Sequence, residues 1–349
     1  MTMLAEAVEI VIGVDTHKHT HTAAVVAAGT GAAVEDTTVP TNPEGYGELL
    51  AMAERHSGLR AWAIEGTGGY GAGLTRFLVE HGEVVIELDR PNRPARRNGA
   101  KSDPLDAVRA GRDALAREHL AQPRSAGQRS ALAVLLAARR SAVEGATDAQ
   151  RQLHALVITA PETLRAKFRG QSTRVMLTAA ARLRCHPSWD SETQTTATVL
   201  RTLARRAQTL ETEARDHERA ILAIVRSWRP DLLDQFGVGP IVAAVVLCAW
   251  SHTGRCRNDA AFANLAGVAP IPASSGQTVR YRLNRCGDRQ LNRALHVVAM
   301  HRLRHDPTTR AYADRRRAQG KTDREIRRCI KRYIARQLYR QLEQPLDGL

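Results

Sequence analysis

Four acidic residues in the N-terminal third of the chain occupy positions where a carboxylate is unusual. Asp15 closes the apolar run "VIGVD", and Glu65 closes "AWAIE". Both runs are typical of buried strands, where an unpaired carboxylate costs several kcal/mol. Asp103 and Asp106 follow in "KSDPLDAVRAG", whose Ser-Asp-Pro sequence is typical of a helix start. Because these two aspartates are three residues apart, they share one face of that helix.

These carboxylates can act together if both strands and the helix meet at one edge of a sheet. Four carboxylates at one point repel one another unless cations neutralise them, and such hard oxygen ligands suit Mg²⁺ or Mn²⁺. Two such ions can hold the attacking and leaving oxygens of a phosphodiester during cleavage. Taken singly, residues of this kind are more often strand-end or helix-cap carboxylates. Their order along this pattern of strands and helix favours a metal site.

Three histidines follow Asp15 at alternate positions, His17, His19 and His21. On a strand they would share one face and could bind a transition metal. Lys18 would then point to the opposite face, where it either contacts phosphate or is solvated. Metal binding by the three histidines is the weaker of the two metal hypotheses.

The elements that must position these residues alternate between strands and helices over residues 8–118. Strands are expected at 9–15, 22–28, 32–40, 59–66 and 83–89, with helices at 42–56 and 70–82. Three successive strands followed by strand–helix units predict an α/β domain with a mixed sheet.

Residues 119–229 have helical spacing and no strand signal. A helix at 195–225 carries a heptad pattern with a positions Leu200, Ala207, Ala214 and Ile221 and d positions Leu203, Leu210, His217 and Ile224. Seven of these eight positions are apolar, which indicates a coiled coil. An antiparallel helical arm within one subunit and a contact between two subunits explain this pattern equally well.

A third region, residues 230–340, opens with "LLDQFGVGPIVAAVVLCAW". Gly237 and Gly239, followed by Pro240 and an apolar helix, resemble a helix-hairpin-helix turn, whose amides can bind a nucleic-acid phosphate. The same spacing also occurs in plain helical hairpins, so both interpretations stay open. A basic helical tail follows, with 14 Lys+Arg and 6 Asp+Glu over residues 301–349.

The overall charge indicates a polyanionic partner. The 349 residues include 51 Lys+Arg and 36 Asp+Glu, a formal charge of +15 with a pI near 10.4. Nucleic acid is the first partner to consider and an anionic membrane surface the second. The apolar run Ile241–Trp250 is shorter than the roughly 20 residues of a bilayer span, and "MTMLAEAVEI" lacks the basic start of a signal peptide. Five scattered cysteines without a CxxC pair suit a reducing cytoplasm.

Several segments occur together in a distinctive order: "GVDTHK", "EGTGGYG", "KSDPLDA", "FGVGPIVAA" and "LAGVAPIPASSGQTVRYRLNRCGDRQLNRAL". They resemble the DEDD transposases of the insertion-sequence 110 family, which includes the Piv-type DNA invertases. The resemblance implies a RuvC-like (RNase H-like) domain at residues 8–118 whose Asp15, Glu65, Asp103 and Asp106 hold Mg²⁺. It also implies a transposase domain at 230–340, with the helical coiled-coil arm at 119–229 between them.

The resemblance further implies that a C-terminal serine takes part in strand breakage and joining. The family serine directly precedes a glycine, which by position is Ser275 before Gly276, although the neighbouring Ser274 leaves the assignment ambiguous. A serine on a loop is, on chemistry alone, usually a turn residue. The basic residues that follow could stabilise the transition state at phosphorus: Arg280, Arg282, Arg285 and Arg289.

The resemblance finally implies a structured noncoding bridge RNA that pairs with donor and target DNA, so that base pairing supplies the sequence specificity. We therefore expect a Mg²⁺-dependent transposase or recombinase, a homo-oligomer active on DNA in a prokaryotic cytoplasm without a membrane association. Two other functions stay open at this point. One is a junction-resolving endonuclease that uses water as the nucleophile, and the other is a non-catalytic nucleic-acid-binding protein.

Overall fold

The computed structural model describes residues 3–88, 102–273, 281–282, 284 and 287–345. The chain divides into two compact units, Met1–Ala126 and Gly127–Leu349. The predicted boundaries, which separate an arm at 119–229 from a domain at 230–340, stay a prediction.

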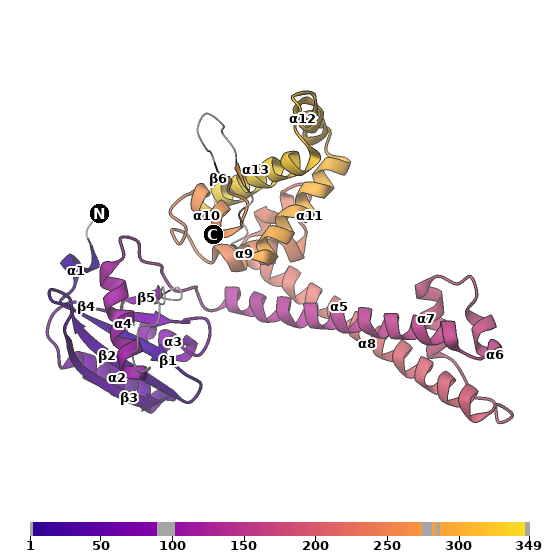
Figure 1. Cartoon of the computed structure of the whole chain (residues 1–349), viewed down its shortest axis with the longest axis horizontal. Helices are drawn as coiled ribbons and strands as arrows, with labels where there is room; N and C mark the ends of the chain where they lie inside the picture. Colours follow the sequence, from indigo (N-terminus) through magenta and orange to yellow (C-terminus); the bar gives the residue numbers. More distant parts are fainter. Residues whose placement is uncertain (1–2, 89–101, 274–280, 283, 285–286, 346–349) are drawn as a thin grey trace. The chain divides into compact units, whose positions relative to one another are not determined.

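The first unit contains a five-stranded mixed sheet, which confirms the predicted mixed α/β architecture (Figure 1). Its strands are β1 Ile10–Thr16, β2 Thr20–Ala27, β3 Ala33–Pro40, β4 Arg60–Glu65 and β5 Val85–Leu88. The spatial order is β3-β2-β1-β4-β5, so β1 lies at the centre. Strand β2 is antiparallel to β1 and β3, whereas β4 runs parallel to β1 and β5.

Each face of this sheet is covered by helices, because alternate residues of each strand point to opposite sides. The helices are α1 Leu4–Ala7, α2 Pro43–Glu54, α3 Ala72–Glu80 and α4 Asp103–Ala116. Ile12 and Ile64 pack with Leu49 and Leu74 of α2 and α3 on one face. Val11, Ala61 and Ala63 pack with α4 on the other face. Any residue of β1 or β4 that lies an even number of positions from Val11, Ala61 or Ala63 therefore points toward α4.

The second unit begins with a long helical arm. Helix α5 Gln128–Thr159 and helix α8 Ser191–Trp228 pack side by side, with α6 Glu162–Arg165, a 3₁₀ helix η1 Ala166–Phe168 and α7 Thr173–Ala181 between them in the chain. Their pairing is antiparallel, since Arg139 contacts Glu218 while Gln150, further along α5, contacts Glu211.

The four predicted a positions of the heptad pattern, Leu200, Ala207, Ala214 and Ile221, are all buried. Since α8 packs on α5 of the same chain, an arm within one subunit accounts for this burial. A contact between two subunits stays a prediction.

The rest of the second unit is a helical module packed around one core. It comprises η2 Pro230–Asp234 (a 3₁₀ helix), α9 Pro240–Trp250, α10 Asp259–Leu265, α11 Arg289–His305, α12 Pro307–Ala318 and α13 Asp323–Glu343. Two short antiparallel strands, β6 Ile271–Pro272 and β7 Tyr281–Arg282, lie between α10 and α11 in the chain. Leu247, Phe262, Leu295 and Leu338 belong to the core. Among the described helices, none combines the length and the apolar character needed to cross a bilayer.

Candidate active site

Asp15 and Glu65 lie at the same edge of the sheet on the face that α4 covers. Strands β1 and β4 are parallel neighbours, and their last paired residues are Val14 and Ile64. The same register extended by one residue sets Glu65 beside Asp15. Both residues are an even number of positions away from strand residues that pack on α4, so both side chains start out toward that helix. The parallel register of β1 and β4 therefore brings these two strand ends together.

Asp103 and Asp106 lie in the first turn of α4, as the predicted helix start requires. Gly13 allows the helix to approach this closely. A Cβ on Gly13 would lie 2.0 Å from the carbonyl oxygen of Ala107 and 2.4 Å from the amide nitrogen of Gly111. Because only glycine leaves room for such a backbone contact, the start of α4 is held against the end of β1.

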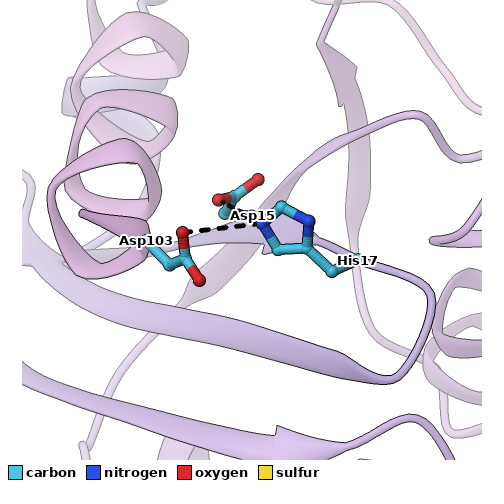
Figure 2. A group of neighbouring side chains, drawn as sticks. All are labelled: Asp15, His17 and Asp103. Carbon is cyan, nitrogen blue, oxygen red and sulfur yellow. Dashed lines mark hydrogen bonds and ion pairs between the residues drawn. The ribbon is translucent and has the colours of Figure 1, made fainter. Parts of the chain in front are cut away.

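Three ligand-type side chains meet where β1 ends and α4 begins. His17 Nε2 lies 3.2 Å from Oδ2 of Asp15 and 3.6 Å from Oδ1 of Asp103. Figure 2 shows the imidazole facing both carboxylates, which come from β1 and from the start of α4. One ligand atom from each of the three residues lies within 4.8 Å of the others. Side chains at such distances can bind one metal ion together.

The other two carboxylates lie outside this group of three. Oδ1 of Asp106 accepts a hydrogen bond of 2.8 Å from Arg109, one turn along the same helix. The Glu65 backbone carbonyl accepts one of 3.0 Å from Oγ1 of Thr16. Glu65 lies on the neighbouring strand β4, and Asp106 lies on α4 with Asp103. Neither carboxylate reaches the ligand spacing of the central group.

The electrostatics of Asp15 favour a cation. Its side chain is 16% exposed. Burial raises the pKa of Asp15, the nearby His17 lowers it, and the charges of Asp103 and Asp106 raise it again, for a net increase. A carboxylate that is desolvated beside two further carboxylates is relieved by a positive ion. Carboxylate oxygens with one imidazole nitrogen fit a divalent metal of the Mg²⁺ or Mn²⁺ class.

The three alternate histidines do not share a face, so the hypothesis of a histidine metal site is wrong. His17 follows β1, and His19 is exposed in the turn, as is Lys18. His21 belongs to β2, is fully buried and stacks on Tyr46 with ring centroids 5.8 Å apart. The turn between the strands breaks the alternation on which that hypothesis depended.

On the sequence alone, His17 groups with the other two histidines and not with the carboxylates. The available signal was its position two residues after Asp15, a spacing that sets two side chains on the same side of an extended chain. The structure brings the two together with Asp103.

The predicted glycine turn of the second unit has a defined geometry. Gly237 has φ +85°, in the left-handed region, and packs against His301 of α11. Gly239 is the N-cap residue of α9. Arg302 donates a hydrogen bond of 2.9 Å from Nε to the carbonyl oxygen of Phe236, which ties this turn to α11. The element before the turn is the 3₁₀ helix η2, whereas a helix-hairpin-helix has an α-helix there.

The predicted serine segment is only partly described. Arg282 is exposed in β7, and Arg289 is the first residue of α11. Ser274, Ser275, Arg280 and Arg285 lie outside the described residues. Strand β7 pairs with β6, so the described residues on either side of the serine position are hydrogen-bonded to each other.

Comparisons with known proteins match both units. A transposase family model of the DEDD type from the IS110 group matches residues 12–160, and the model of the transposase IS116/IS110/IS902 family matches residues 231–314. The chain is 30% identical over 315 residues to an uncharacterized 42 kDa protein of insertion element IS900 from Mycobacterium paratuberculosis, covering 74% of this chain and 77% of that protein. It is 39% identical over 94 residues to an uncharacterized 43.6 kDa protein of insertion element IS110 from Streptomyces coelicolor, covering 27% of this chain and 23% of that protein.

Proposed function

Since the chain belongs to the IS116/IS110/IS902 transposase family, we propose that it breaks and rejoins DNA with a metal centre at Asp15. As a member of this transposase family it is an enzyme that acts on DNA by cleavage and rejoining. The observation that carries the metal centre is the meeting of Asp15, His17 and Asp103 within ligand distance. These side chains come from the end of β1 and the start of α4, two elements whose close approach Gly13 permits.

Mg²⁺ or Mn²⁺ is the ion we propose for this centre, with Asp15, Glu65, Asp103 and Asp106 as its carboxylate ligands. His17 adds a nitrogen donor beside Asp15 and Asp103. Such an ion would polarise a phosphodiester and stabilise the negative charge that develops on its oxygens. The protein side chains orient that centre at the open edge of the sheet, where β1 and β4 both end.

The finer architecture is also part of the proposal. We propose that the first unit is a RuvC-like (RNase H-like) domain, which agrees with its central strand carrying the acid and its order β3-β2-β1-β4-β5. The catalytic domain would span residues 8–118, the coiled-coil arm 119–229 and the transposase domain 230–340. Gly237 and Gly239 of the last domain, with Lys18 of the first, are proposed contacts to nucleic-acid phosphates.

Ser275 is the proposed nucleophile for strand exchange. Its Oγ would form a bond to phosphorus as a P–O bond to deoxyribose breaks, and its proton would pass to a base. The released sugar oxygen takes up a proton, and attack by another sugar hydroxyl reverses the step and rejoins DNA. Arg280, Arg282, Arg285 and Arg289 would stabilise the charge at phosphorus. Ser274 is the alternative nucleophile.

A bridge noncoding RNA is the proposed guide, pairing with both donor and target DNA in the nucleoid. The formal charge of +15 supports binding to several polyanionic strands at once. A homo-oligomer, formed through the arm, would bring two active sites to one recombination event. Purifying the protein from cells that carry its native flanking DNA, and sequencing the bound RNA, tests the guide directly.

Recombination between two plasmids tests the catalytic proposal. We expect recombinant product from the unaltered protein with Mg²⁺ or Mn²⁺, and none from Asp15→Asn. Ser275→Ala should also abolish product, while Ser274→Ala should keep it. Retained strand cleavage by Ser275→Ala would show that water is the nucleophile and would replace recombination with a junction-nuclease function. Full activity of Asp15→Asn would overturn the metal centre.

A further inference from the structure

The second unit buries a lysine between helices α11 and α13 without an acidic partner. Lys331 of α13 is only 9% exposed, and its Nζ donates a hydrogen bond of 2.9 Å to Oδ1 of Asn292 on α11. Within the described part of the chain, no acidic side chain forms an ion pair with this ammonium or contributes to the shift of its pKa. A buried charge that lacks a counter-charge is costly, so it indicates a ligand of opposite sign.

Asn292 is held in place as the acceptor for this lysine. Its Nδ2 donates hydrogen bonds of 2.7 Å to the carbonyl oxygen of Ala266 and 3.3 Å to that of Gly267, at the end of α10. Because the amide nitrogen is used in this way, the amide oxygen faces Lys331. The ammonium carries three N–H donors, and the bond to Asn292 uses one. Among the described residues, the bond to Asn292 is the hydrogen bond recorded for this ammonium.

Two arginines and a histidine lie near Lys331 on α11 and α13. Arg327 and Arg328 lie about one turn before Lys331 on α13, and His296 lies one turn after Asn292 on α11. The Nε atoms of the two arginines donate to carbonyl oxygens of their own helix, at 3.1 and 3.3 Å. Burial, followed by the charges of Arg328 and Arg327, lowers the pKa of Lys331. Burial, followed by Lys331 and Arg327, lowers the pKa of His296.

This cationic cluster is connected to the segment that carries the proposed nucleophile. Gly267, which accepts from Asn292, precedes β6 by a few residues. On the other side of the serine segment, a Cβ on Gly287 would lie 2.7 Å from the amide nitrogen of Gly267. The hydrogen bonds from Lys331 to Asn292 and from Asn292 to Gly267 therefore reach described residues on the two sides of the serine segment in the sequence.

We propose that Lys331, with Arg327, Arg328 and His296, binds one phosphodiester group of a DNA strand. The proposal rests on the proposed function, and it deepens that function by naming where the second unit contacts the strand that Ser275 would attack. The chemistry is a phosphate oxygen accepting N–H donors from one buried ammonium, two guanidinium groups and one imidazole. Asn292 is a positioning residue that acts through Lys331.

Binding of the full-length protein to a fluorescent 30-bp DNA duplex, measured by anisotropy at several salt concentrations, tests this site. We expect Lys331→Met to weaken binding about tenfold, because one charge-assisted contact is lost. The slope of log K against log salt should become shallower by about 0.9, the value for one neutralised phosphate. The thermal midpoint should stay equal or rise, since an uncompensated buried charge is removed.

Lys321→Met is the matched control. Lys321 is exposed just before α13, and its Nζ already lies 3.9 Å from Oε1 of Glu325. This control should leave both the affinity and the salt slope unchanged. Equal affinity and slope for Lys331→Met and Lys321→Met would overturn the proposal, as would a loss of binding that accompanies a lower thermal midpoint in Lys331→Met.

Two further measurements complete the test. If Lys331→Met does not fold, Lys331→Gln keeps a donor toward Asn292, and it should still give the reduced slope. A duplex RNA of the same sequence distinguishes the ligand class, and a defect confined to RNA would overturn the assignment to DNA. Failure of the unaltered protein to bind either duplex would count against the proposed function as a whole. Normal binding by Lys331→Met and Lys331→Gln would count against this site alone.

Discussion

Gly13 of the central strand lies in backbone contact with Ala107 of helix α4, so closely that a Cβ on Gly13 would be 2.0 Å from the Ala107 carbonyl oxygen. This contact sets how far the start of α4 stands from the end of β1. Asp103 and Asp15 are carried by these two elements, and His17 reaches both carboxylates. The spacing of the candidate metal ligands thus depends on a residue without a side chain.

We expect Gly13→Ala to destabilise the fold by about 1–3 kcal/mol, because the added methyl group meets backbone atoms that cannot rotate away. The same variant should lose divalent-metal binding as α4 moves outward. Urea unfolding and Mn²⁺ titration measure the two effects. Gly47→Ala in α2 is the control: nothing lies within 4 Å of its added Cβ, and it should stabilise the helix by up to about 1 kcal/mol.

Asp15→Asn should raise the thermal midpoint of the metal-free protein. Burial and the nearby aspartates raise the pKa of Asp15, so its charged form destabilises the fold and an amide relieves this cost. The variant should also lose stabilisation by Mn²⁺, which in the unaltered protein should reach about 2.7 kcal/mol at 100 times the Kd. Calorimetry with and without Mn²⁺ measures both. Asp36→Asn, at an exposed position of β3, should change neither result.

The buried His21 should make the free energy of unfolding depend on pH. Burial lowers the pKa of this histidine, which stacks on Tyr46 inside the core. The unfolded chain therefore takes up a proton near pH 6.5 while the folded protein does not, so the free energy of unfolding falls as the pH drops below about 6.5. His21→Phe should make unfolding in urea less dependent on pH between 7.5 and 5.5. An unchanged pH dependence in that variant would contradict the assignment, and His19→Gln, in the exposed turn, serves as control.

The arm offers a test of self-association. Leu210, a predicted d position, is partly exposed, and its Cδ1 would lie 3.1 Å from a Cβ on Gly145 of α5. If a second copy covers the remaining surface of Leu210, Leu210→Asp should convert an oligomer into a monomer of 38.3 kDa. Light scattering coupled to size exclusion measures the mass. The same mass for the variant and the unaltered protein would mean that the arm does not hold two copies together.

Local sequence patterns were enough to predict the mixed sheet, the helical remainder and the order of the four acids. These features depend on local spacing: alternation in strands, heptad and helical periods, and a Ser-Asp-Pro helix start. Two similar apolar runs that each end in an acid predicted strand ends carrying Asp15 and Glu65, whereas the parallel register that sets them side by side is a finding of the structure. A family resemblance carried by short motifs could therefore be recognised without coordinates.

Which side chains meet depends on how distant elements pack, and local patterns did not predict it. His17 joins Asp15 and Asp103 while His21 enters the core, because a turn between β1 and β2 separates residues that alternate in the sequence. The a positions of α8 are covered by α5 of the same chain, a choice between partners that a heptad pattern leaves open. Lys331 is buried against Asn292 on another helix. Contacts between distant elements depend on how helices and strands pack, and no local period encodes that packing.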